Sequence, residues 1–165
     1  VRLVGSEMCI RDRCLTLADD FSHECVDIAV DFGISGQYVT RLLDQAAIFR
    51  GYPVAVRTDN GPEFTSRAFL AWTTLHGIRH ILIQPGRPMQ NGYIESFNGK
   101  FRDECLNEQW FQSLPQARDC IAEWRKDYIE VRPHSSLGRI PPAQFAQQQR
   151  IQIFATDFNN NQFLD

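Results

Sequence analysis

The sequence of 165 residues shows no long apolar run, no C-x-x-C pair and no signal-peptide pattern in its first residues. No apolar stretch approaches the roughly 18 residues that a membrane-spanning helix needs, which excludes an integral membrane protein. Its five cysteines never combine with its four histidines at zinc-ligand spacing, which disfavours a structural zinc site. The odd number of cysteines, the lack of a C-x-x-C pair and the missing signal-peptide pattern favour a reducing cytoplasm.

The chain also has no excess of positive charge. Seventeen lysines and arginines face twenty acidic residues, and the net charge is −3. A protein that clamps nucleic acid unaided is normally basic, so any affinity for DNA must be local or shared with parts outside this chain. Hydrophobic residues at 43% and charged residues at 22% are typical of a globular chain, and the length fits a single domain.

The order of the expected elements predicts a mixed α/β sheet flanked by helices. A polar turn joins the first two strands, and the strand–helix–strand order of the last two implies that they pair in parallel. The strands are expected at residues 14–19, 23–31, 53–57 and 78–83. Helices are expected after a cap at Ser35, from about residue 65, over residues 91–106 and after a cap at Ser113.

Asp59 stands where an apolar strand gives way to the turn Asp59-Asn60-Gly61-Pro62. The carboxyl ends of strands in open α/β sheets are where ligands collect, so this position favours a functional carboxylate. The alternative is that Asp59 only shapes the turn, as aspartate often does before Asn-Gly. Asn60 either orients Asp59 or helps to shape the same turn.

The helix expected over residues 91–106 has an apolar side and a polar side. At about 100° per residue, residues of each kind cluster on one side of the helix. The apolar cluster is Tyr93, Ile94, Phe97, Phe101 and Cys105, and the polar stripe is Asn91, Glu95, Asn98 and Arg102. Arg102 lies about 10 Å along the helix from Glu95, so the two charges face the same way without neutralising each other. The stripe can meet a polar substrate, or it can be the solvated face of an amphipathic helix.

Three motifs resemble the catalytic core of retrovirus-integrase-like transposases of the insertion-sequence group. They are Thr58-Asp59-Asn60-Gly61-Pro62-Glu63-Phe64, Asn91-Gly92-Tyr93-Ile94-Glu95-Ser96-Phe97-Asn98-Gly99 and Arg132-Pro133-His134-Ser135-Ser136-Leu137-Gly138. Between Asp59 and Glu95 stand 35 residues, and Arg102 follows Glu95 by seven places. Both spacings belong to the pattern of this group, and the motifs follow its order over roughly residues 14–145.

The resemblance implies an RNase H-like fold with a DDE triad of metal-binding acids. Asp59 and Glu95 would be two of these acids, and would hold Mg²⁺ or Mn²⁺ for the cleavage and joining of DNA strands. Mg²⁺ prefers oxygen ligands, so it requires no cysteine or histidine. The resemblance also implies self-association on transposon-end and target DNA, and a place in the bacterial cytoplasm with the nucleoid. The residues expected to contact DNA are Arg102, Asn91, Asn98, Arg87 and Lys100.

Two further segments have open alternatives. Arg87 lies in the loop before the Glu95 helix, where the family has a mobile segment near the substrate. That loop could equally be a plain solvent-facing connection. His134 either contacts DNA or makes a hydrogen bond that fastens its loop to the body of the domain, and we favour the hydrogen bond.

The first acid of the triad is absent from the place where the family has it. It should lie in a strand ahead of Cys14, but residues 1–13 show no aromatic-rich lead and no alternating run around an acid. They resemble the peptide produced when sequencing-adaptor bases are translated, so we expect them to be foreign to the protein. Asp12 is too close to the second strand to replace the acid. We therefore expect a truncated and inactive enzyme, with its first strand missing or replaced and one edge of the sheet open.

These expectations divide the chain into three parts: a foreign segment at residues 1–13, an integrase-like catalytic core at residues 14–145, and a loosely ordered tail at residues 146–165. Two rival functions keep the same fold. One is a DNA-binding or assembly module that has lost catalysis. The other is a nuclease that hydrolyses DNA without joining strands.

Overall fold

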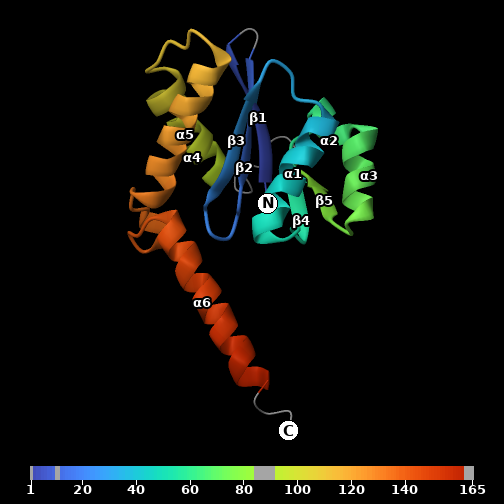
Figure 1. Ribbon diagram of the computed structural model, residues 1–165, viewed down its shortest axis with the longest axis vertical. Coiled ribbons are helices and arrows are strands. Elements are labelled where there is room, and N and C mark those ends of the chain that lie inside the picture. Colours follow the sequence, from blue (N-terminus) through green and yellow to red (C-terminus); the bar gives the residue numbers. More distant parts are fainter. Residues whose placement is uncertain (1, 10–11, 84–91, 162–165) are drawn as a thin grey trace.

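A five-stranded sheet of order β3-β2-β1-β4-β5 runs through the middle of the domain (Figure 1). The computed structural model describes residues 2–9, 12–83 and 92–161, with side chains for residues 13–83 and 92–152. β1, β2 and β3 pair antiparallel, whereas β1–β4 and β4–β5 pair in parallel, which confirms the parallel pairing expected for the last two strands. The strands are β1 Arg2–Cys9, β2 Asp12–Ala18, β3 Cys25–Asp31, β4 Ala55–Thr58 and β5 Arg79–Leu82.

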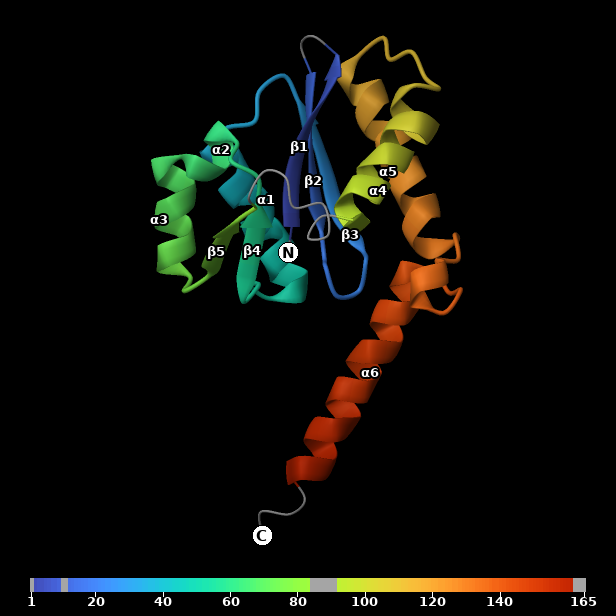
Figure 2. The same cartoon turned by 180° about the vertical axis from the view of Figure 1, so that it is seen from behind.

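Helices cover both faces of this sheet, as Figures 1 and 2 show. One face carries α1 Gly36–Arg50, α2 Pro62–Thr65 and α3 Arg67–Leu75. The other carries α4 Gly92–Phe101, the π-helical turn η2 Arg102–Leu106 and α5 Leu114–Glu130. A 3₁₀ turn, η3 Ser135–Leu137, precedes α6 Pro142–Asn161. Within the described residues, no helix is both long and apolar enough to cross a bilayer.

Serine side chains begin three of these helices. The Oγ of Ser35 accepts a hydrogen bond from the N–H of Tyr38 at the start of α1, and Ser113 accepts one from Gln116 at the start of α5. Ser66 caps α3 in the same way. Each cap satisfies a backbone donor that the helix leaves unpaired, which is worth about 1 kcal/mol. The caps at Ser35 and Ser113 confirm the helix starts expected from the sequence.

Alternate residues of β2 belong to two different cores. Cys14 and Ala18 pack beneath α4 and α5, whereas Leu15 and Leu17 pack beneath α1 and α3. Thr16, which lies on the same face as Cys14 and Ala18, is fully buried. The two helical layers are therefore separated by the sheet, and each has its own hydrophobic core.

Aromatic rings fill the core between α4 and α5. The ring centroid of Phe97 is 5.5 Å from that of Trp124 and 5.0 Å from that of Tyr128, edge-on in both pairs. Trp124 also packs on Phe101 and donates its Nε1–H to Glu104 at 3.2 Å. Phe97 and Phe101 come from the apolar side that helical spacing predicts for residues 91–106, so that prediction is confirmed.

β1 lies at the centre of the sheet and joins its two halves. It pairs with β2 on one side and with β4 on the other, so the sheet is continuous from β3 to β5. The expected open edge is therefore wrong, because residues 2–9 take the place of the first strand. Without them, β2 and β4 would each present unpaired backbone N–H and C=O groups next to buried cores. That residues 1–13 are foreign to the protein stays a prediction.

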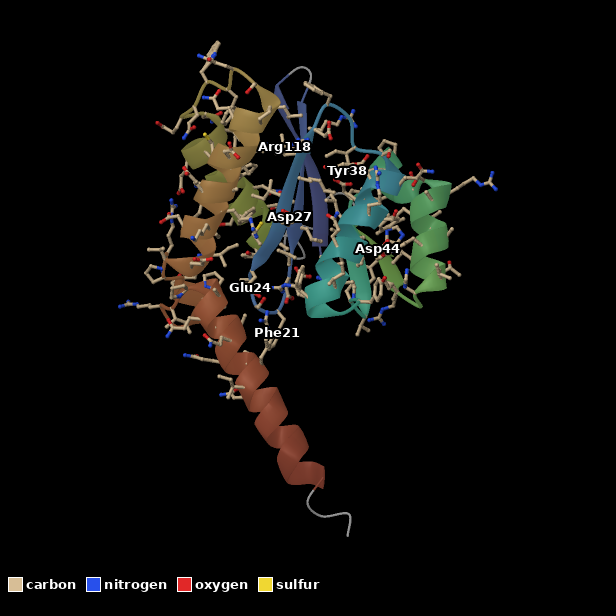
Figure 3. All side chains as sticks on the ribbon, viewed as in Figure 1. Phe21, Glu24, Asp27, Tyr38, Asp44 and Arg118 are labelled. Atoms are coloured by element: carbon tan, nitrogen blue, oxygen red, sulfur yellow. The ribbon has the colours of Figure 1, made fainter. Side chains whose placement is uncertain are left out.

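α6 projects away from the body of the domain (Figure 1). Its first turns rest on the β2–β3 turn, where the ring centroids of Phe21 and Phe145 are 6.2 Å apart and Arg150 lies 3.4 Å from Glu24. Figure 3 places Phe21 and Glu24 at this end of the sheet, beside the beginning of α6. Glu24 is buried and also pairs with Arg50 of α1. The segment expected to be loosely ordered is thus helical to the end of α6, and its loose attachment stays a prediction.

The contact between α1 and α2 leaves no room for a side chain at Gly36. A Cβ there would stand 1.8 Å from Ser66 Oγ and 2.8 Å from the Glu63 carbonyl oxygen. We expect Gly36→Ala to lower the free energy of unfolding by about 1–3 kcal/mol, because α1 must move or the Ser66 cap must break. Gly99→Ala is the matched control, since a Cβ in that helix meets nothing within 4 Å. The control should raise stability by up to about 1 kcal/mol in urea unfolding, and equal unfolding midpoints for Gly36→Ala and the unsubstituted protein would contradict the packing described.

Candidate catalytic site

Asp59 follows β4 directly and is half-buried at the carboxyl end of that strand. Its Oδ1 accepts a hydrogen bond from the N–H of Gly61 at 3.0 Å, which closes the turn. The preceding Thr58 is fully buried, donates its hydroxyl to the Asp59 carbonyl at 2.8 Å, and lies 2.8 Å from Nε2 of His80 on β5. Because the hydroxyl proton is already donated, we assign the ring proton of His80 to Nε2. Burial lowers the pKa of His80, which favours this neutral ring. The hydrogen bond between Thr58 and His80 ties the end of β4, where Asp59 follows, to the neighbouring strand β5.

A second carboxylate, Glu63, faces the same space as Asp59. A Cβ added to Gly61 would stand 2.8 Å from Glu63 Oε1 and 3.1 Å from Asp59 Oδ1. The Oε2 atom of Glu63 is buried and has no hydrogen-bond partner among the described residues. A buried, unpaired carboxylate oxygen is costly, so this atom is suited to a water or a cation. Sequence reasoning gave Glu63 no role; the available signal was its place four residues after Asp59 in the same motif.

Glu95 lies on the exposed side of α4, whereas Ile94 and Phe97 beside it are buried. Asn98, one turn further along, is half-buried. Its Oδ1 accepts a hydrogen bond from the hydroxyl of Thr16 on β2 at 3.2 Å. The Asn98 side of α4 is therefore bound to the sheet, and Glu95 stands at the border between that side and the solvent.

The register of the sheet places Asp59 in a row with residues of β1 and β2. Thr58 of β4 pairs with Leu3 of β1, so Asp59 is level with Val4. Val4 in turn pairs with Thr16 of β2. Residues that are level in neighbouring strands share a face of the sheet, so these positions form one row on the α4 side. Two strand spacings, or about 10 Å, span the row.

Asn98 accepts its hydrogen bond from Thr16, at the far end of this row, and Glu95 lies one helical turn before Asn98 on α4. The fold thus brings the two expected metal ligands, Asp59 and Glu95, to the same side of the sheet. A third ligand would lie between them on β1, but the residue level with Asp59 is Val4. The acid that β1 does contain, Glu7, lies three positions further along, about 10 Å away.

The residues expected to contact DNA lie in different places. Arg102 is exposed at the point where α4 passes into the π-helical turn. The chain between Glu95 and Arg102 is regular α-helix, so the expected spacing between these two residues is kept. Lys100 is also exposed, but lies on the opposite flank of α4 from Asn98. Asn98 uses its side-chain oxygen in the bond to β2. Arg87 and Asn91 fall outside the described residues.

His134 fastens its loop to the body of the domain. Its Nε2 lies 3.3 Å from the carbonyl oxygen of Tyr128, and its ring meets the Tyr128 ring edge-on with centroids 4.6 Å apart. Its backbone N–H also bonds to the carbonyl of Ile140. Burial lowers the pKa of the ring. The fastening role that we favoured from the sequence is therefore confirmed.

The donor set suits a hard divalent cation held in an open site. In the described part of the chain, no three His, Cys, Asp or Glu side chains are grouped so that they could enclose a metal ion. Mg²⁺ commonly binds through one or two carboxylates and substrate phosphates, and it keeps several waters. The carboxylates of Asp59 and Glu63, which both lie beside Gly61, together with Glu95 across the row, fit that requirement better than they would fit a closed metal cage.

The strand order, with helices on both faces and an acid at the end of β4, defines an RNase H-like fold. The structure is similar to the crystal structure of the catalytic core domain of BIV integrase, with a TM-score of 0.73 and 13% sequence identity. The similarity covers 93% of this chain and 96% of that one. At this identity, the likeness concerns the fold.

The chain belongs to the integrase core domain family, because two models of that domain match it over residues 7–88 and 76–142. It is 75% identical over 142 residues to the uncharacterized 39.2 kDa protein of insertion element IS476 from Xanthomonas euvesicatoria, covering 86% of this chain and 41% of that protein. It is 24% identical over 151 residues to the putative transposase InsK of insertion sequence element IS150 from Escherichia coli, covering 87% and 52%. The chain thus spans about half the length of these curated relatives.

Proposed function

We propose that this domain is the catalytic core of a bacterial insertion-sequence transposase, which cleaves transposon-end DNA and joins it to target DNA. The observation that carries the proposal is the placement of Asp59 and Glu95 on one side of an RNase H-like sheet. The relatives encoded by insertion elements support it. The proposal includes self-association on DNA and a place of action in the bacterial cytoplasm, where the DNA lies.

Each carboxylate of the site has a distinct task in this proposal. When bound, two Mg²⁺ ions activate the attacking oxygen and stabilise the leaving oxygen of a phosphodiester. Asp59 and Glu95 would hold these ions, and the bond from Gly61 to Asp59 Oδ1 keeps that carboxylate in a fixed orientation. Glu63, with its unpaired buried oxygen, would hold a water or share the ion at Asp59. Arg102 would contact a DNA phosphate.

We also propose that the chain is inactive by itself. The register leaves Val4 where the row would need its third acid, so β1 supplies no carboxylate between Asp59 and Glu95 to hold a pair of metal ions. The same observation favours the rival function, a DNA-binding or assembly module with this fold, for the chain as it stands. The function of the transposase to which this domain would belong and the activity of this chain by itself are therefore separate questions.

Metal binding provides the test of the proposed site. We expect Asp59→Asn and Glu95→Gln each to weaken Mn²⁺ binding by about tenfold or more, because each removes one of the few charged ligands; tenfold corresponds to about 1.4 kcal/mol. The measurement is the loss of the free Mn²⁺ signal in electron paramagnetic resonance. Asp103→Asn, an exposed acid one residue beyond Arg102, is the control and should leave binding unchanged. Undiminished Mn²⁺ affinity in Asp59→Asn would refute the site.

A further inference from the structure

A pocket of about 560 Å³ lies between α4, the end of α5, the β2–β3 turn and η3. Ser96 and Lys100 line it from α4. Viewed down that helix, Ser96 points about 100° to one side of Glu95, and Asn98 points about 60° to the other side. Glu95 therefore stands between the row of the sheet and this pocket, and its chain neighbour Ser96 belongs to the pocket wall.

The described residues that line the pocket include two cations and no acid, although the chain as a whole is acidic. None of the described residues that line it is an aspartate or a glutamate, in a chain where twenty acids outnumber seventeen lysines and arginines. Lys100 supplies positive charge, whereas the charge of Arg132 is offset by Asp127 and Glu104 and this residue contributes N–H donors. His23, His134 and Ser136 supply ring nitrogens and a hydroxyl. A concave surface of this composition attracts anions.

The guanidinium of Arg132 is held in place before any ligand arrives. Its Nε donates to Asp127 and its Nη1 donates to Glu104. Its Cζ lies 5.9 Å from the ring centroids of both Trp124 and Tyr128. Among the described residues, none accepts a hydrogen bond from Nη2, so this nitrogen keeps its donors for a ligand. A fixed guanidinium loses little conformational freedom on binding, which favours recognition of a phosphate.

The two histidines of the pocket are held by neighbouring rings and hydrogen-bond partners. His23 stacks on Tyr93 with centroids 4.2 Å apart, and its Nδ1 lies 3.4 Å from the hydroxyl of Ser136. His134 is held by Tyr128, as described above. Burial lowers the pKa of both histidines, and for His23 it does so although nearby carboxylates act in the opposite direction. Neutral rings of this kind contribute hydrogen bonds, while Lys100 contributes the charge.

We propose that this pocket binds a backbone phosphate of the DNA strand next to the phosphate that is cleaved. The inference rests on the proposed function, because it places a neighbouring phosphate of the same strand beside Glu95. The pocket is large enough for a phosphate with its sugar. Lys100 and the free Nη2 of Arg132 pair with the phosphate oxygens, and Ser96 and Ser136 add hydroxyl contacts.

The first measurement is binding of a fluorescein-labelled twelve-nucleotide thymidine strand, followed by anisotropy in EDTA so that no metal ion takes part. We expect Lys100→Gln to weaken binding about threefold and to reduce the salt slope by about 0.7, the contribution of one phosphate contact on a single strand. Lys126→Gln removes the same charge from an exposed position of α5 outside the pocket, and should leave affinity and slope unchanged.

The second measurement uses the four histidines of the chain, of which two line the pocket and two do not. In NMR spectra of the imidazole groups, the thymidine strand should shift the Cε1–H signals of His23 and His134. The signals of His76 and His80, which lie on α3 and β5, should stay in place. The same titration is repeated with inorganic phosphate.

Each outcome decides the proposal. Shifts of His23 and His134 by the strand, reduced in Lys100→Gln, support it. Binding of the strand without these shifts overturns the pocket and leaves the proposed function standing. Shifts by inorganic phosphate alone, with none from the strand, show a site for a free anion and overturn the DNA assignment. Absence of strand binding at low salt overturns the inference as well, while the Mn²⁺ measurement still decides the catalytic site.

Discussion

Val4→Asp is expected to give the chain a metal-dependent DNA-nicking activity, raised roughly a hundredfold or more over the unsubstituted chain. Position 4 is level with Asp59 and pairs with Thr16, whose hydroxyl reaches Asn98 on the helix that carries Glu95. An aspartate there stands between the two existing acids and completes the triad. The measurement is conversion of supercoiled plasmid to open circles in Mn²⁺ or Mg²⁺.

Two further variants identify the source of this activity. Val4→Asn has nearly the same shape without the charge, so it should fold like Val4→Asp and show no nicking. Glu95→Gln added to Val4→Asp should abolish the nicking. If Val4→Asn nicks as fast as Val4→Asp, the activity does not come from a triad. A folded Val4→Asp protein, verified by circular dichroism, that binds Mn²⁺ but fails to nick would show that the row is not the reaction centre.

Trp124→Ala is expected to lower the free energy of unfolding by about 3–5 kcal/mol. This ring is 8% exposed, contacts Phe97, Phe101 and Tyr128, and donates its N–H to Glu104. Its loss opens a cavity where α4 and α5 meet. Because a domain of this size has only about 5–15 kcal/mol of stability, a large share would be lost. Urea unfolding followed by circular dichroism measures the effect.

Trp110→Ala provides a matched control, since this tryptophan is 83% exposed. The same change of residue type on the surface should alter stability by no more than about 0.5 kcal/mol. Similar midpoint shifts for both variants would mean that the α4–α5 core contributes no more to stability than the surface. Comparing the two variants also shows how much of the loss of stability in Trp124→Ala comes from the burial of the ring and how much from removing any tryptophan side chain.

Much of the fold could be predicted from local patterns. Ser35 and Ser113 mark helix starts because their side chains satisfy backbone donors only a few residues away, and those bonds depend on adjacent sequence. The apolar side of α4 was predictable from spacing alone. β1 was not, because its strand conformation depends on β2 and β4, which lie on both sides of it and come later in the chain.

The candidate site was predictable only in part. Asp59 and Glu95 were found because motifs surround them, and the sheet register then brings them to one side. Glu63 was missed because its proximity to Asp59 depends on how closely the chain folds around Gly61, which is a property of three dimensions. The pocket beside Glu95 was missed for the same reason, since its walls come from four separate segments.

The projecting α6 has a mechanical consequence. A helix of 20 residues is about 30 Å long, and the first turns of this one pack on the domain, where Phe145 meets Phe21, Arg150 meets Glu24 and Ala146 is buried. A tilt of about 10° at this contact therefore swings the Asn161 end through roughly 5 Å. Small changes where the first turns of α6 pack are thus magnified into larger displacements at the Asn161 end of the helix.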